Sequence, residues 1–171
     1  KFGQRQECLT RLERIEEHNL ESAQRARAEL YRGVAFRDLG RMSDAIEACR
    51  RARQTALEAL DEEHPLFAEI DLEEGVAIAR SGQFEAALTR FESSAAAFDR
   101  LHDYHRAAES RDCLGNVFYL RGQLAAAMSE YTNAQRSWRQ LADPQAQIAT
   151  MNSMGSVQHM LGELDTARDT F

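Results

Sequence analysis

Glycine spacing is the feature of this 171-residue sequence that most constrains its fold. Four glycines are each followed seven residues later by another, and the four pairs begin 42, 40 and 40 residues apart. We call the first member of a pair the leading glycine and the second the turn glycine. The pairs are Gly33 and Gly40, Gly75 and Gly82, Gly115 and Gly122, and Gly155 and Gly162. A fixed period of this length is typical of repeat architectures, in which similar units stack on one another.

Two further positions recur in the same register. An alanine stands twelve residues after each leading glycine, and an aromatic residue or a cysteine stands sixteen residues after it. These residues are Ala45, Ala87, Ala127 and Ala167, and Cys49, Phe91, Tyr131 and Phe171. The agreement of several positions in four units predicts four copies of one structural unit.

Each unit is predicted to be a hairpin of two helices. Apolar residues recur at helical spacing on both sides of the turn glycine, and glycine can adopt the left-handed conformation that ends a helix. Pro65 and Pro144 mark two other helix starts, because proline is acceptable at a first helical position. A leading glycine costs about 1 kcal/mol relative to alanine inside a helix, which is tolerable if it lets neighbouring backbones approach closely. No run combines β-branched residues with period-two alternation, so we expect an all-α fold.

The expected organisation is a single solenoid fragment over residues 1–171, built from antiparallel helices of roughly 15 to 20 residues. The stack is expected to wind as a right-handed α-α superhelix. Its predicted parts are a trailing helix of a preceding repeat over 3–20, repeats over 22–61, 65–102 and 104–142, and a truncated repeat over 144–171.

The combined pattern resembles the tetratricopeptide repeat (TPR), whose small residue, alanine and aromatic residue correspond to Gly115, Ala127 and Tyr131 and their equivalents. The period is longer than the usual value of about 34 residues. It is similar to the repeats of kinesin light chains and of large bacterial transcription regulators. Three residues depart from the family pattern. Arg32 and Glu74 occupy a site that is usually leucine, and Ser94 occupies one that is usually alanine.

Composition excludes several classes of function. The formal net charge of −7 makes nucleic-acid contact by this segment improbable, because such modules carry a basic face. No apolar run approaches the roughly 20 residues that span a bilayer, so we expect no membrane contact. Three widely spaced cysteines fit reduced thiols in a cytoplasmic protein. The chain starts without Met and stops inside a repeat, which favours an excised piece of a longer protein.

No catalytic or metal-binding pattern is present in the sequence. His102 and His105 lie three residues apart at a predicted helix junction, and no third ligand follows at the spacing of a metal site. Cys8 and Cys49 fall on packing positions, so burial is favoured over reactivity. We therefore expect no enzyme activity, no cofactor and no metal.

The TPR resemblance implies a binding surface, because the first helices of such repeats line a concave inner wall. In the first two units the corresponding positions are mostly apolar, and in the last two they are polar and rich in amides. Asparagine amides at such sites can donate and accept hydrogen bonds to a peptide backbone. An alternative for Leu30 and Leu72 is that they only pack between adjacent helices. The candidate wall residues are Leu30, Val34, Arg37, Leu72, Val76, Arg80, Asp112, Asn116, Tyr119, Asn152, Ser156 and His159.

Three functions compete on this basis. The resemblance implies a scaffold that binds a protein or peptide on its concave face. The alternative is a ligand-sensing or oligomerisation segment of a larger bacterial transcriptional regulator, of the LuxR-type ATPase or the peptide-sensing kind. A helical enzyme domain is disfavoured, because an open repeat array does not build a closed polar pocket. Exposed apolar edges at truncated ends also predict self-association.

Overall fold

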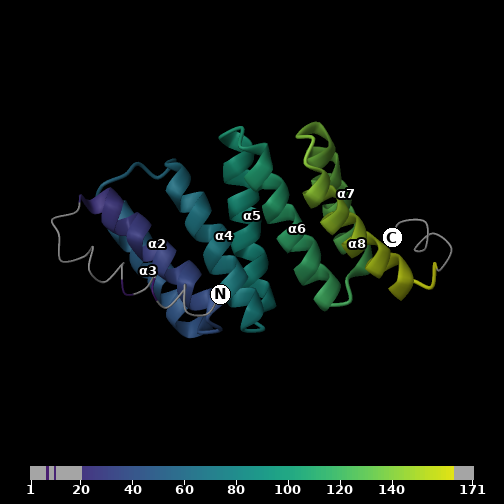
Figure 1. The fold of residues 1–171 in the computed structure, drawn as a ribbon, viewed down its shortest axis with the longest axis horizontal. Helices are drawn as coiled ribbons and strands as arrows, with labels where there is room; N and C mark the ends of the chain where they lie inside the picture. Colours follow the sequence, from purple (N-terminus) through teal and green to yellow (C-terminus); the bar gives the residue numbers. More distant parts are fainter. Residues whose placement is uncertain (1–6, 8–9, 11–20, 164–171) are drawn as a thin grey trace. The chain divides into compact units, whose positions relative to one another are not determined.

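The computed structural model describes Glu7, Thr10 and residues 21–163. The predicted helix over 3–20 and the register positions Ala167 and Phe171 lie outside the described residues, apart from Glu7 and Thr10. Every regular element within 21–163 is an α-helix, which confirms the all-α prediction (Figure 1). The helices are α2 (Ser22–Asp38), α3 (Met42–Leu57), α4 (Pro65–Arg80), α5 (Phe84–Arg100), α6 (Tyr104–Leu120), α7 (Leu124–Gln140) and α8 (Pro144–Met160).

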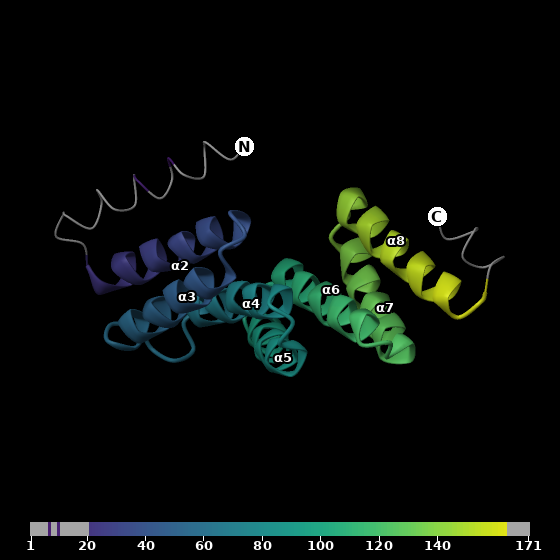
Figure 2. The ribbon, with the colours of Figure 1, turned by 90° about the horizontal axis from the view of Figure 1, so that it is seen from below.

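Turn glycines end the first helix of each hairpin, as the sequence predicts. Gly40, Gly82, Gly122 and Gly162 all have positive φ, between 72° and 82°. An L side chain is strained in this left-handed region, whereas glycine is not. The tight turns at Gly40 and Gly122 fold α2 against α3 and α6 against α7, so each pair is antiparallel (Figures 1 and 2).

Junctions between hairpins are built differently. Pro65 and Pro144 each occupy the first turn of their helix, as expected. Asp143 caps α8 by accepting hydrogen bonds from the backbone N–H of Gln145 and Ala146, at 3.1 and 3.0 Å. The left-handed position after α5 and α7 is taken by His102 (φ 57°) and Ala142 (φ 52°). The glycine pattern did not predict these two ends, because neither residue is a glycine.

Close packing explains the repeated small residues. Ala45, Ala87 and Ala127 are fully buried. A Cβ on Gly33 would lie 2.9 Å from Cys49 Sγ and 3.2 Å from the Ala45 carbonyl oxygen. A Cβ on Gly115 would lie 2.5 Å from the ring of Tyr131. At these two positions, the leading glycine makes room for the residue sixteen positions later. The predicted approach of a neighbouring backbone is seen at Gly33, whereas at Gly115 the neighbour is a side chain.

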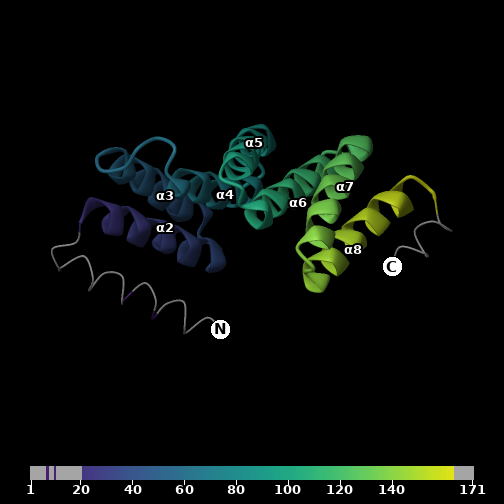
Figure 3. The ribbon, with the colours of Figure 1, turned by 90° about the horizontal axis from the view of Figure 1, so that it is seen from above.

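Contacts gather the chain into two compact units, Lys1–Arg90 (unit 1) and Phe91–Phe171 (unit 2), and the division falls within α5. In unit 1 a core cluster joins α2, α3 and α4. Its buried members are Ala26, Leu30, Cys49, Ala52, Ala56, Leu66, Phe67 and Ile70. In unit 2, α7 lies against α6 and α8 (Figure 3). One core cluster of this unit contains Ala108, Ala134 and Trp138, and another contains Ala127, Tyr131 and Val157.

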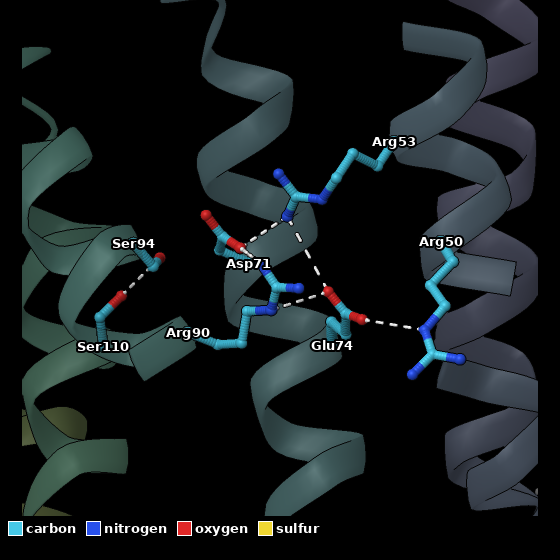
Figure 4. Close-up of polar contacts among 7 residues, drawn as sticks. All are labelled: Arg50, Arg53, Asp71, Glu74, Arg90, Ser94 and Ser110. Atoms are coloured by element: carbon cyan, nitrogen blue, oxygen red, sulfur yellow. Dashed lines mark hydrogen bonds and ion pairs between the residues drawn. The ribbon is translucent and has the colours of Figure 1, made fainter. Parts of the chain in front are cut away.

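One departure from the TPR pattern creates a buried charge cluster in unit 1. Glu74 is 1% exposed and Asp71 is 5% exposed, both on α4 (Figure 4). Arg53 of α3 lies 2.5 Å from an Asp71 carboxylate oxygen, and Arg90 of α5 lies 3.0 Å from a Glu74 carboxylate oxygen. Arg50 approaches Glu74 at 3.8 Å. The carboxylates are therefore neutralised by arginines from the two neighbouring helices, which is how buried charges are tolerated.

The other departures also have polar partners. In unit 2, the buried Ser94 and Ser110 hydroxyls lie 3.0 Å apart (Figure 4). Ser110 also donates to the Arg106 carbonyl oxygen at 2.9 Å. In unit 1, Arg32 donates to Glu29 at 2.6 Å. Ser94 and Arg32 are thus hydrogen-bonded, which limits the cost of burying them. Glu74 is instead held by ion pairs with arginines, and its buried Oε2 accepts no hydrogen bond from the described residues.

Candidate functional site

In unit 1, the candidate wall residues lie on α2 and α4, and two of them are core residues. Leu30 is 2% exposed within the core cluster, and Leu72 is 6% exposed. Their side chains contribute packing, which is the alternative that the sequence left open for them. Val34 and Val76 are half-buried and keep some surface.

Arginine side chains on this face differ in their availability. Arg37 of α2 forms an ion pair with Glu73 of α4 and a second, at 3.1 Å, with Asp38. Its charge is therefore compensated within unit 1. Arg80 lies at the end of α4 and is exposed. A ligand carboxylate would compete with two internal carboxylates for Arg37, so this residue is a weak anchor.

In unit 2, Asp112 is the centre of a hydrogen-bond cluster that joins three helices. The indole Nε1–H of Trp138 on α7 donates to Asp112 at 2.8 Å. The hydroxyl of Thr150 on α8 lies 3.0 and 2.9 Å from the two carboxylate oxygens. Burial raises the pKa of Asp112 to about 6, although these two donors favour the ionised form and partly offset it. Asp112 therefore links the wall helices to α7.

Asn116 lies one turn after Asp112 on α6 and is exposed. Its side-chain oxygen accepts a hydrogen bond from the Tyr131 hydroxyl at 2.7 Å. Tyr131 is 2% exposed, and burial raises its pKa to about 12, so the phenol keeps its proton at neutral pH. The hydroxyl reaches residue 116 because Gly115 lets the ring lie against the α6 backbone.

On α8, the candidate residues point to a more open surface. Asn152 and His159 are exposed, and Ser156 donates to the Asn152 carbonyl oxygen at 2.9 Å. On α6, Tyr119 packs against the second core cluster of unit 2 and is only half-buried. Two apolar side chains at the ends of these helices extend the surface, since Leu120 is 62% exposed and Met160 is 60% exposed.

We call the set Asp112, Asn116 and Tyr119 of α6 and Asn152, Ser156 and His159 of α8 the unit 2 wall. The two helices are in contact, so the structure brings these residues onto neighbouring elements. Sequence reasoning named them but missed the residues that hold them in place. The repeat pattern marks Tyr131 only as a packing residue, and nothing in the local sequence around Trp138 and Thr150 signals their bonds to Asp112.

The described residues also bear on metal binding, thiol reactivity and membrane spanning. Within residues 21–163, Glu7 and Thr10, no group of three or more His, Cys, Asp or Glu side chains could hold a metal ion. His105 instead lies 3.7 Å from Asp143. Cys49 is buried, and burial raises its pKa to about 12, so it is a poor nucleophile. In the same part of the chain, no helix has the length and apolar character needed to span a membrane.

Comparisons with known proteins rest on structure. No protein-family model and no curated protein sequence matches this chain. Among solved structures, BtubC (BKLC) from P. vanneervenii superposes with a TM-score of 0.83 at 20% identity, covering 95% of this chain and 67% of that one. The TPR-like repeats of a putative kinesin light chain from Podospora anserina give 0.77 at 19% identity, covering 98% and 84%. This chain has the fold of a TPR-like repeat array.

A third similar structure is a regulator. The Rap conjugation gene regulator of the plasmid pLS20, solved in complex with the Phr* peptide, gives a TM-score of 0.74 at 19% identity. The TPR-like chain aligns over 84% of its own length and spans 40% of that regulator. Sequence identities this low establish the fold alone. The comparisons therefore show a helical repeat scaffold and do not identify the molecule that it binds.

Proposed function

We propose that this TPR-like array is a scaffold that binds a peptide segment of another protein, and that the peptide lies along the unit 2 wall. The observation that carries the proposal is the exposure of amide, imidazole and apolar side chains on successive turns of α6 and α8. Asn116, Asn152 and His159 offer hydrogen bonds, while Leu120 and Met160 offer apolar contact. Extended peptides are recognised by this combination of backbone hydrogen bonds and side-chain contacts.

The negative charge of the unit 2 wall and of the whole chain limits which peptides can bind. Glu109 and Asp112 lie on the same face of α6 as Asn116, and the whole chain carries a net charge of −7. Like charges disfavour an acidic ligand, and opposite charges speed association. We therefore infer a neutral or basic peptide. In unit 1, Leu30, Leu72 and Arg37 are committed to internal contacts, whereas Val34, Val76 and Arg80 keep exposed surface and are candidate contacts of that unit by itself.

The Rap comparison supports the same chemistry, because that regulator was solved with a peptide bound. It also favours the second candidate function, a ligand-sensing segment of a larger regulator. Identifying the domains next to this segment distinguishes a peptide-binding scaffold from a segment of a regulator. A DNA-binding or nucleotide-binding domain in the same protein supports the regulator, and its absence supports a scaffold.

A displayed library of random twelve-residue peptides, selected on the purified chain, tests peptide binding. The combined substitution of Asn116→Ala and Asn152→Ala is expected to weaken the enriched peptides about tenfold or more, because two hydrogen bonds are lost. The matched control removes two exposed amides from α7 and its N-cap, Gln140→Ala with Gln123→Ala, and is expected to change affinity less than about twofold. Unchanged binding by the wall variant, with its helicity intact, would place the peptide elsewhere.

A further inference from the structure

Asn116 differs from its equivalents in a way that pairs with a second position. The residue after the leading glycine is Val34, Val76, Asn116 or Ser156 in the four units, and the residue fifteen positions later is Cys49, Phe91, Tyr131 or Phe171. Only the third unit combines an amide at the first position with a hydroxyl at the second. In that unit the two groups lie 2.7 Å apart.

This hydrogen bond determines which end of the amide is free. The Tyr131 hydroxyl donates, so it occupies the side-chain oxygen of Asn116, and the NH₂ group lies at the opposite end of the planar amide. The ring of Tyr131 is fixed by burial and by close contact with Gly115. A buried hydroxyl that is held in place can therefore orient an exposed amide before any ligand arrives, which lowers the ordering cost of binding.

We infer that Tyr131 is a positioning residue that fixes Asn116 with its NH₂ group outward, so that the unit 2 wall donates a hydrogen bond to a neutral carbonyl of the bound peptide. The inference rests on the proposed function for the identity of the ligand. The acceptor is a backbone carbonyl rather than a carboxylate, because a ligand carboxylate would be repelled by the acidic residues nearby. Asp112 lies one turn from Asn116, and Glu109 is close enough to Asp112 to interact with its charge. A carboxylate of the ligand at this position would be repelled by both Asp112 and Glu109.

The orientation can be tested without a ligand. In the ¹⁵N-labelled chain, the side-chain NH₂ group of Asn116 is expected to be rigid, with an order parameter approaching the roughly 0.85 of ordered backbone. In Tyr131→Phe it is expected to fall below about 0.6, the range of flexible groups. Tyr104→Phe, which removes an exposed hydroxyl from α6, is the control and is expected to leave the signal unchanged. Equal mobility in the wild type and Tyr131→Phe would overturn the positioning role.

Binding provides the second measurement, with a peptide enriched from the random twelve-residue library as the probe. Tyr131→Phe is expected to weaken it about 3- to 10-fold, since an ordinary hydrogen bond contributes about 0.5–1.5 kcal/mol. In the Asn116→Ala background, Tyr131→Phe is expected to have no further effect, because Tyr131 acts through Asn116. Additive losses would contradict this.

Two further results distinguish a wrong assignment of the acceptor from a failure of the proposed peptide binding. Amidation of the peptide C-terminus is expected to leave affinity unchanged, and a large loss would show that a terminal carboxylate is the acceptor. If the library yields no binder, the proposed function and the carbonyl assignment both fail. The mobility of Asn116 would still decide whether Tyr131 orients it.

Discussion

At the scale of single residues, the repeated small residues are explained by what lies against them. Gly33 meets Cys49 and Gly115 meets the ring of Tyr131, so the size of the later residue requires the absence of a side chain at the earlier one. Ala45, Ala87 and Ala127, on the second helices of the first three hairpins, are fully buried. A side chain at Gly33 or Gly115 would clash with its neighbour, and we expect larger side chains at the buried alanines to overpack the core.

Ala127 provides a direct test of this packing. Ala127→Leu is expected to lower the free energy of unfolding by about 1–3 kcal/mol, because added methyl groups overpack a filled core. Ala125→Leu places the same change on an exposed position of α7 and is expected to alter stability by less than about 0.5 kcal/mol. Urea unfolding of both variants measures the difference. Equal stabilities would mean that the space around Ala127 is not filled.

Asp112 should make stability depend on pH. Its pKa is about 6 in the folded chain against 3.8 for an unperturbed aspartate, so the folded chain binds more protons between these values. Stability from this group is therefore expected to fall as pH rises from about 4 to about 6. Asp112→Asn has no such proton, so the wild type should lose stability relative to this variant across that window. Chemical unfolding at several pH values measures it, and parallel curves would contradict the raised pKa.

At the scale of helices, the contacts between elements decide which polar residues are tolerated. The carboxylates of α4 are matched by Arg53 of α3 and Arg90 of α5. On α6, Asp112 is matched by donors from α7 and α8. The buried carboxylates of α4 and α6 are therefore tolerated because neighbouring helices supply their partners.

Glu74 is expected to be needed for the stability of unit 1. Glu74→Gln keeps the shape but removes the charge, and should lower the free energy of unfolding by about 3 kcal/mol, because the arginines lose a buried counter-charge. Asp44→Asn is the control, because its pair with Arg41 is about half exposed and should contribute about 0–1 kcal/mol. Thermal and urea unfolding compare the two. A smaller loss in Glu74→Gln than in Asp44→Asn would show that the arginines simply turn to solvent.

At the scale of the whole molecule, the described chain is a series of helical hairpins, and the first helix of a hairpin carries exposed side chains. The winding of these hairpins into a superhelix stays a prediction. Self-association also stays a prediction. It is supported by exposed apolar residues of unit 2, among them Ile148, which is 60% exposed. The residues at the same repeat position as Ile148 in the other three units are Ala26, Ala68 and Ala108, which are smaller and buried.

Sedimentation velocity over a range of concentrations measures self-association. The coefficient of the wild type is expected to rise with concentration, because exposed apolar surface favours association. Ile148→Gln should reduce the rise, whereas Leu57→Gln, at a 57% exposed position of unit 1, should not. A strict monomer at the highest concentration would contradict the prediction.

The helical hairpins, the glycine turns within them and the TPR-like fold follow from the sequence alone. Local physics is enough for these features, because left-handed glycines, first-turn prolines and helical periodicity act within a few residues of one another. Which wall residues are exposed depends on how the helices pack against one another. Leu30 and Asn116 are both wall positions in the sequence, yet one is buried against Leu66 and Ile70 and the other is exposed with its amide held by Tyr131. Burial and hydrogen bonding depend on side chains from other helices, so no local pattern could distinguish a packing residue from a binding residue.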